Sequence, residues 1–153
     1  MLIIILALLI PQMAEARIGE TLAECITRYG EPIDKLLASN SSEIRFAYFT
    51  KGGFVIQVDA LNGVCQCITY KKNDETAIEA ETLKRILSKN HDSWRLIGKG
   101  HIGTQWCSQE TGLGKYTATY LTRDRKLLII TQQYTDDRDR KKTEKRKKSV
   151  EGL

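Results

Sequence analysis

The sequence predicts an α+β fold in which two helices pack on one face of an antiparallel sheet. Two segments carry apolar residues at helical spacing, and each is followed by segments in which apolar and polar residues alternate. Glycine, asparagine and aspartate separate the alternating segments, which is typical of strands joined by hairpins. The expected order is helix, three strands, helix, then three or four strands, and this order favours helices packed against one face of the sheet.

The first helix is expected over residues 21–29. Its apolar residues recur at steps of three and four, which places them on one face of a helix. Gly30 and Pro32 follow, and both residue types end helices. The residues of the apolar face are Leu22, Cys25, Ile26 and Tyr29.

Three strands are expected between residues 44 and 71, because the apolar period changes to two after a polar loop segment. Alternating apolar residues occur at 44–48 and at 54–58, with Lys51-Gly52-Gly53 as the connection. Asn62-Gly63 then predicts a type I′ turn, which leads into a third strand over 64–71. These strands should form an antiparallel meander.

The second half is expected to contain a helix and a further part of the sheet. A helix that begins at Asp74 or Glu75 and ends at Asn90 carries an apolar stripe, and its acidic residues lie early, where the helix dipole favours them. After this helix the period is again two, interrupted by glycines. The last two strands, 115–122 and 126–134, are expected to form a hairpin.

The N-terminal residues predict export. Residues 1–10 form an unbroken apolar run, and Ala14-Glu15-Ala16 has the small-x-small pattern of a signal-peptidase site. A membrane-spanning helix needs about 20 apolar residues, and Glu15 and Arg17 end this run well short of that. We therefore expect a signal peptide at 1–16 and a periplasmic or extracellular mature chain without a transmembrane segment. The run lacks the usual preceding Lys or Arg, which favours a start codon upstream of Met1 over an atypical signal.

One folded domain is expected over residues 17–135, followed by a basic tail over 136–153. The chain is 41% hydrophobic and 7% aromatic, which allows one modest core. The formal charge of +5 is concentrated in the tail, which has almost no apolar residue and should be disordered or a frayed helix. The basic residues of the tail are Arg138, Arg140, Lys141, Lys142, Lys145, Arg146, Lys147 and Lys148.

Four cysteines, Cys25, Cys65, Cys67 and Cys107, form an even set in a chain expected to leave the reducing cytosol, so two disulfides are predicted. Cys65 and Cys67 are one residue apart on a predicted strand, so their side chains should leave the same face and could bond to each other only under strain. Each is therefore expected to bond to Cys25 or to Cys107. The sequence leaves both pairings open.

The segment TLAECITRYGEP, residues 21–32, is followed by strands and an Asn-Gly turn. It resembles the helix-then-Gly-x-Pro opening of small exported domains of the SmpA/OmlA and β-lactamase-inhibitor-protein type. The resemblance covers about the first half of the chain and implies a binding module, not an enzyme. Arg17 follows Ala16 at the processing site, where there is no lipobox cysteine, so the lipoprotein anchoring of the SmpA/OmlA group is not implied. A soluble exported domain is implied.

A glycine motif in the second half needs a structural context that the sequence does not supply. Residues 98–103, GKGHIG, spell G-x-G-x-x-G, and Asp124 follows at about the 20-residue distance of dinucleotide-binding sites. Such a site needs a helix after the glycines, and no helical period follows Gly103. We therefore expect a glycine-rich loop or a bulged strand, and no cofactor.

Cys65, Cys67, His101 and Cys107 are residue types that can bind zinc, but zinc needs reduced thiolates and an exported chain meets oxidising conditions. Neither His91 nor His101 has a signature that ties it to a cysteine nucleophile. The sequence has no G-x-S-x-G or H-E-x-x-H motif. No catalytic residue and no metal ligand is therefore predicted.

Five aromatic residues of the second half, Trp94, Trp106, Tyr116, Tyr120 and Tyr134, can fill the core or form a recognition surface. Core packing is the simpler interpretation.

Three functional hypotheses follow. The first is an exported non-enzymatic module that binds an unknown protein or associates with the envelope. The second is an adaptor whose basic tail attaches to an anionic lipid or wall polymer, rather than to nucleic acid. The third is an envelope enzyme without a recognised motif.

Overall fold

The computed structural model confirms the α+β fold. It describes residues 17–36, 44–109, 112 and 114–151, and the expected signal segment, residues 1–16, lies outside the described residues. Along the chain the elements are α1 (Leu22–Tyr29), β1 (Asp34–Leu36), β2 (Ile44–Lys51), β3 (Phe54–Leu61), β4 (Val64–Lys72), α2 (Ala80–Asn90), β5 (Trp94–Lys99), β6 (Gly103–Ser108), β7 (Tyr116–Leu121), β8 (Lys126–Thr131) and α3 (Gln132–Glu151).

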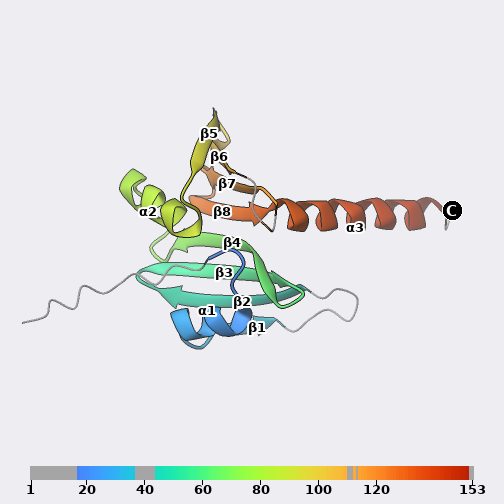
Figure 1. The fold of residues 1–153 in the computed structure, drawn as a ribbon, viewed down its shortest axis with the longest axis horizontal. Coiled ribbons are helices and arrows are strands. Elements are labelled where there is room, and N and C mark those ends of the chain that lie inside the picture. Colours follow the sequence, from blue (N-terminus) through green and yellow to red (C-terminus); the bar gives the residue numbers. More distant parts are fainter. Residues whose placement is uncertain (1–16, 37–43, 110–111, 113, 152–153) are drawn as a thin grey trace, which may run out of the picture.

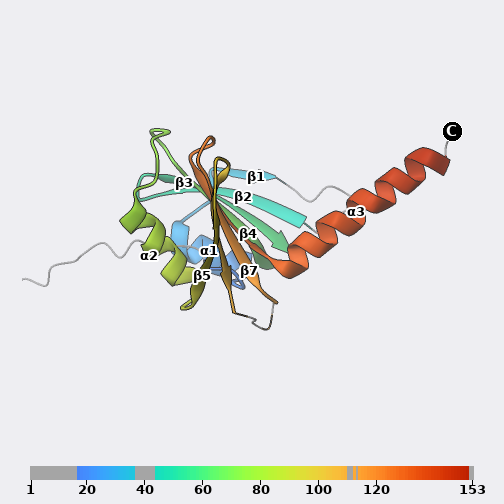
Figure 2. The ribbon, with the colours of Figure 1, turned by 90° about the horizontal axis from the view of Figure 1, so that it is seen from above.

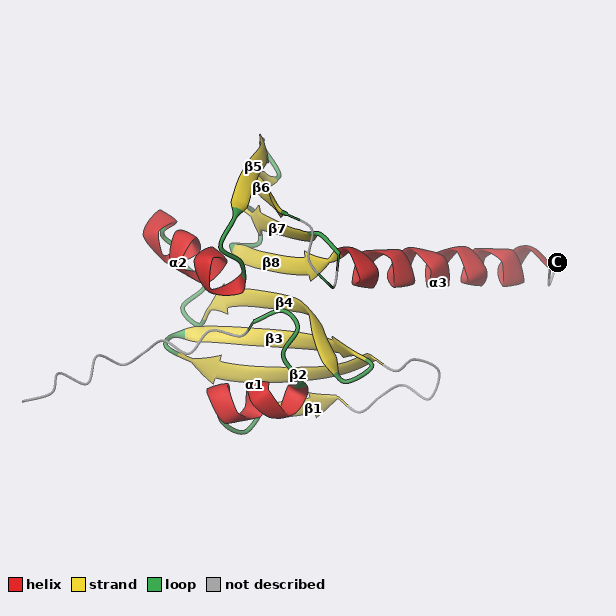
Figure 3. Cartoon of the chain, viewed as in Figure 1, coloured by secondary structure: helices red, strands yellow, loops and turns green. Residues whose placement is uncertain are grey.

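The strands form one eight-stranded sheet in the order β1-β2-β3-β4-β8-β7-β6-β5, and neighbouring strands are antiparallel. β1 and β5 are the two edges, and β4 and β8 meet in the middle. The sheet twists, so that its two halves lie at an angle to each other (Figure 1, Figure 3). The predicted meander is confirmed, and the short β1 extends it by one strand.

The two halves of the chain follow the same plan. Each begins with a helix, α1 or α2, continues with four strands, and ends with the strand that pairs across the centre. In both helices, the residues that face the sheet have the same spacing. These residues are Leu22, Cys25, Ile26 and Tyr29 in α1, and Leu83, Ile86, Leu87 and Asn90 in α2.

α1 begins and ends where the sequence predicts. The Thr21 side chain and Glu24 form a capping box, in which the Thr21 backbone N–H donates to Glu24 Oε2 over 2.7 Å. Gly30 follows the helix with φ of 92°, a left-handed conformation that glycine adopts without strain. An ion pair between Arg28 and Glu20 ties the last turn to the preceding segment.

α2 begins later than expected, at Ala80 instead of Asp74 or Glu75. The Asp74 side chain accepts a hydrogen bond from the Thr76 backbone N–H over 3.0 Å, which is a local turn that competes with helix formation. Glu75 has a positive φ of 57°, which is incompatible with a right-handed helix. The predicted end at Asn90 is confirmed.

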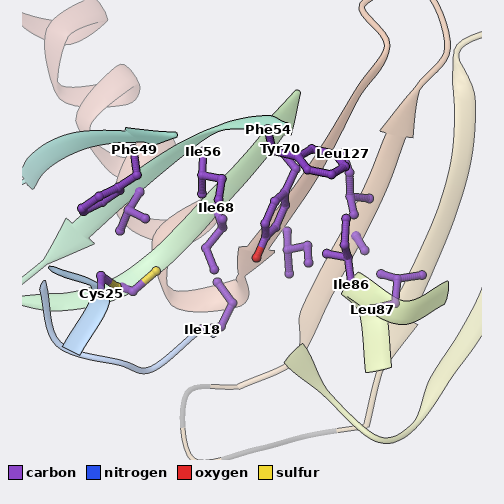
Figure 4. Close-up of a cluster of buried hydrophobic side chains, with 14 of the residues drawn as sticks. Ile18, Cys25, Phe49, Phe54, Ile56, Ile68, Tyr70, Ile86, Leu87 and Leu127 are labelled. Atoms are coloured by element: carbon purple, nitrogen blue, oxygen red, sulfur yellow. The ribbon is translucent and has the colours of Figure 1, made fainter. Parts of the chain in front are cut away.

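The core lies between the sheet and the two helices α1 and α2. Side chains of both helices and of both halves of the sheet form one buried cluster, so the two helices cover the same face. We call this the inner face and the opposite one the outer face. Figure 4 shows Cys25 and Ile86 pointing into the same layer as Phe49, Ile68 and Leu127.

The C-terminal tail, expected to be disordered or a frayed helix, is a helix, and this helix begins before the boundary expected at residue 136. α3 starts at Gln132, so residues 132–134 form its first turn and do not extend the last strand. Lysine, arginine, glutamate and glutamine favour helix, and the pair Lys141 Nζ–Asp137 Oδ2, at 2.8 Å, adds a contact one turn apart. α3 projects away from the rest of the protein (Figure 2). No helix among the described residues has the length and apolar character needed to cross a membrane.

Replacing Ile68 with alanine is expected to lower the free energy of unfolding by about 2–5 kcal/mol. Ile68 is fully buried and lies opposite Ile129 where the two halves meet, so the lost contacts affect both. Urea unfolding followed by circular dichroism measures the change. Ile33→Ala, at a side chain that is 63% exposed, is the control and should change the same free energy by about 0.5 kcal/mol or less. Separate transitions for the two halves would contradict one continuous core.

Candidate functional site

Exposed apolar side chains gather on the hairpin formed by β5 and β6. Leu96, Ile97 and Ile102 are 56%, 51% and 78% exposed. Single exposed apolar residues are common on protein surfaces, but three within one seven-residue stretch form a patch. We call these three residues the hairpin patch.

The backbone presents the hairpin patch at the edge of the sheet. Leu96 lies opposite Trp106, and Gly98 lies opposite Gln105, so Ile97 is an extra residue that forms a bulge in β5. β5 is the last strand of the sheet order, and no further strand pairs with it among the described residues. Its outer backbone groups therefore face away from the sheet.

A hollow of about 400 Å³ lies beside the patch. At Gly98 and Gly100 no heavy atom lies within 4 Å of the position that a Cβ would take, so the missing side chains leave this space open. Gly103 has the opposite role, because a Cβ there would lie 1.8 Å from the backbone oxygen of Tyr120. The lining residues are Gly98, Lys99, Gly100, His101, Ile102, Gly103, Gln105 and Thr119.

The G-x-G-x-x-G segment is this hairpin. Gly103 begins strand β6, so the helix that a dinucleotide site places after the glycines is not there. The backbone N–H of Gly100 donates to the oxygen of Gly103 over 2.9 Å, which closes the turn. The interpretation as a glycine-rich loop next to a bulged strand is confirmed.

The prediction that Cys65 and Cys67 share a face is wrong. Ala60 pairs with Cys65 and Asp59 with Cys67, so Gln66 is an extra residue in β4 and reverses the alternation. Cys65 packs in the inner-face core, whereas Cys67 packs with Ile130 and Tyr134 in a second, outer cluster.

The four cysteines are free thiols, and the structure brings one pair of them together. Cys25 and Cys65 are both fully buried and lie next to each other in the inner-face core. The contact with Cys25 and burial raise the pKa of the Cys65 thiol. Burial also raises the pKa of Cys67, so neither has the thiolate character of a nucleophile.

A disulfide between Cys67 and Cys107, which belongs to one of the two predicted pairings, is incompatible with the sheet. Cys67 lies opposite Ile130, Ile130 opposite Thr117, and Thr117 opposite Cys107. Three strand spacings of about 4.8 Å separate Cys67 from Cys107 by about 14 Å, which exceeds the reach of a disulfide. Of the predicted pairs, the pair of Cys25 and Cys65 is the one that lies together in the core.

The zinc ligand set is not assembled. Cys65 and Cys67 lie on opposite faces, and Cys107 and His101 lie in the other half of the sheet. No group of three or more metal-ligating side chains occurs within the residues that the structure describes.

A buried polar cluster fixes the start of α3 to the outer face. Asp59 is 6% exposed, and its carboxylate accepts hydrogen bonds from Tyr134 Oη over 2.9 Å and Gln57 Nε2 over 2.7 Å. Burial raises the pKa of Asp59, although the hydrogen bonds from Gln57 and Tyr134 oppose this shift. The Thr131 hydroxyl accepts from the Tyr134 backbone N–H over 3.1 Å and donates to Gln66 Oε1 over 2.6 Å.

The aromatic residues of the second half pack in the core. Trp94, Trp106 and Tyr120 lie against the main cluster, Tyr116 belongs to it, and Tyr134 belongs to the outer cluster. Trp94 Nε1 donates to the Leu87 carbonyl over 2.7 Å, which joins β5 to α2. The packing interpretation is confirmed.

Comparison of the chain with protein-family models, with curated proteins and with solved structures gives no match. The resemblance of the first half to small exported binding domains stays a prediction.

Sequence reasoning missed the hairpin patch and the Asp59 cluster. The composition of residues 93–109 is a signal for the patch, because this stretch combines exposed apolar residues with basic ones and has no acidic residue. The only signal for the cluster is the charged Asp59, two residues after the polar Gln57, in a strand whose other residues are apolar.

The raised pKa of Asp59 predicts a pH-dependent contribution to stability. The Asp59 carboxyl holds its proton more tightly in the folded protein than in the unfolded protein. The free energy of unfolding of the original protein, relative to that of Asp59→Asn, should therefore fall as pH rises above about 4. At pH values below the unfolded-state pKa, the difference between the two proteins should not change with pH. Urea unfolding midpoints of both proteins across pH measure it, and a difference that grows with pH would contradict the prediction.

Proposed function

We propose that this chain is an exported, non-enzymatic protein-binding module that uses the free edge of β5 and the hairpin patch to bind a partner. The observation that carries the proposal is the exposure of Leu96, Ile97 and Ile102 beside an unpaired strand edge. Contact with a partner would remove this apolar surface from water.

The free edge favours an extended ligand. An edge strand offers unpaired N–H and C=O groups, and an added strand gains affinity from the main chain and selectivity from side chains seated in pockets. β5 has six residues, and the hollow beside it is large enough for a partner side chain. These features support recognition of a short extended segment.

The charge of the hairpin selects the chemistry of that segment. Arg95 and Lys99 are exposed on β5, and residues 93–109 contain no acidic residue. An acidic segment with alternating apolar residues is therefore complementary in charge and in apolar surface. A second copy of this chain is a poorer ligand, because antiparallel pairing of two β5 strands centred on Ile97 would place Arg95 opposite Lys99.

A peptide of alternating valine and glutamate should bind the full chain, and Ile97→Asp should weaken this binding at least about tenfold, because it removes apolar contact and adds repulsion. Fluorescence anisotropy of the labelled peptide measures the affinity. Ile33→Asp is the matched control, since Ile33 is 63% exposed near the opposite edge and should leave the affinity unchanged.

A peptide of alternating valine and lysine tests charge selection and should bind more weakly than the glutamate peptide. Equal affinity for the two peptides would contradict the proposal for the β5 edge. An equal loss of affinity in Ile97→Asp and Ile33→Asp would contradict it as well.

Two observations support export as part of the proposed function. Residues 14–16 have the pattern of a signal-peptidase site. Cys25 and Cys65 are adjacent in the core, where an oxidising compartment favours a disulfide between α1 and β4. Formation of this bond transfers two electrons to an oxidant such as glutathione disulfide, which takes up the two protons and leaves as two thiols.

Refolding the full chain in an oxidising glutathione buffer should give one disulfide, Cys25–Cys65, with Cys67 and Cys107 free. The bridge closes a loop of about 40 residues and should stabilise the fold by about 4 kcal/mol. Mass spectrometry of non-reduced digests identifies the bond, and Cys67→Ser should keep it whereas Cys25→Ser should remove it. Four free thiols after oxidation, or a bond that includes Cys67 or Cys107, would contradict the assignment.

A further inference from the structure

α3 distributes its charges unevenly around its circumference. At 3.6 residues per turn, six basic residues fall within about half of the helix surface. The acidic residues Asp136, Asp137, Asp139 and Glu144 all fall on the other half. The six residues, which we call the basic stripe, are Arg138, Lys141, Lys142, Lys145, Arg146 and Lys148.

The basic stripe is accessible. Lys141 is half-buried and is paired with Asp137, and the other five side chains of the stripe are exposed. The stripe extends about 15 Å along the helix axis at a rise of about 1.5 Å per residue. In Figure 2, α3 extends clear of the sheet and of the other two helices, so these elements do not cover the part of α3 beyond its first turns.

The base of α3 holds the stripe in a fixed orientation. Tyr134 is 7% exposed and bonds to Asp59 on the sheet, and Thr131 caps the first turn. Arg138 follows Tyr134 by one helical turn, so the stripe continues the side of the helix that docks on the sheet. A stripe fixed in this way can meet a surface without first ordering a flexible tail.

We propose that the basic stripe of α3 binds the surface of an anionic lipid bilayer. Phosphate headgroups are complementary in charge, and each basic residue near such a surface raises partitioning about fivefold. Residues 135–151 contain no aromatic, asparagine or glutamine residue, so α3 lacks aromatic rings to stack on bases and amides to read their edges. The helix also lacks an apolar face, so it attaches to the headgroups without inserting.

Sedimentation of the full chain with vesicles of phosphatidylcholine and phosphatidylglycerol in equal amounts tests the proposal. The double variant Lys142→Gln, Lys145→Gln removes two charges from the stripe and should weaken binding at least about tenfold. The matched control, Arg140→Gln with Lys147→Gln, removes the same charge from the opposite side and should weaken binding less than about threefold. Circular dichroism establishes that both variants keep the helix.

Four outcomes would overturn the proposal. If the chain does not sediment with these vesicles, or binds equally to vesicles of phosphatidylcholine alone, an anionic bilayer is not its ligand. If the two double variants lose the same affinity for the vesicles, binding depends on net charge and not on the stripe. Tighter binding to duplex DNA, to single-stranded RNA or to polyglutamate than to the vesicles at the same salt concentration assigns α3 to another polyanion. The hairpin peptide assay is independent of all four, because its variants lie outside α3.

Discussion

The pairing of β4 with β8 is the constraint on which the rest of the structure depends. It is the one strand pair that joins the two halves of the sheet. The inner-face residues of this pair are at most 1% exposed, so the pair also lies at the centre of the core. These residues are Ile68, Tyr70, Leu127 and Ile129. Because α1 and α2 both pack on this part of the sheet, neither half of the chain, one helix with its four strands, buries its apolar face alone. The halves therefore stabilise each other.

The bulge at Gln66 adapts the central strand to both faces. It directs Cys65 toward Cys25 on the inner face and leaves Cys67 on the outer face, where Tyr134 covers it. The buried Gln66 side chain accepts a hydrogen bond from Thr131, the residue that ends β8 and caps α3. One inserted residue thus places Cys65 in the same core as Cys25 and the Gln66 side chain against the residue that caps the C-terminal helix. Bulges often re-aim side chains in this way.

Local periodicity was sufficient to predict α1 with its end, the meander of β2, β3 and β4, the presence of α2 and the last hairpin, because each depends on neighbours in sequence. The side of Cys67 was not predictable, since a bulge arises from the pairing of β4 with β3 and leaves no mark on one strand. For the tail, disorder and a frayed helix both stayed open because its sequence lacks an apolar stripe, and the helix there depends on intrinsic propensity and on docking of Tyr134. The hairpin patch was missed because the exposure of a side chain depends on which other parts of the fold pack over it, and one sequence does not show this.

The two proposed surfaces lie in different places and use different forces, which makes them separable. β5 is three strands from β8, about 14 Å across the sheet, and α3 leaves the end of β8 and extends away from the sheet. Attachment through the basic stripe would therefore leave the hairpin patch uncovered. Salt screens exposed charges over about 8 Å at physiological ionic strength, so it weakens attachment of α3. Salt also screens the contact of Arg95 and Lys99 with an acidic partner, but the apolar contact and the main-chain pairing at β5 remain, so a rise in salt should weaken attachment of α3 more than partner binding at the hairpin.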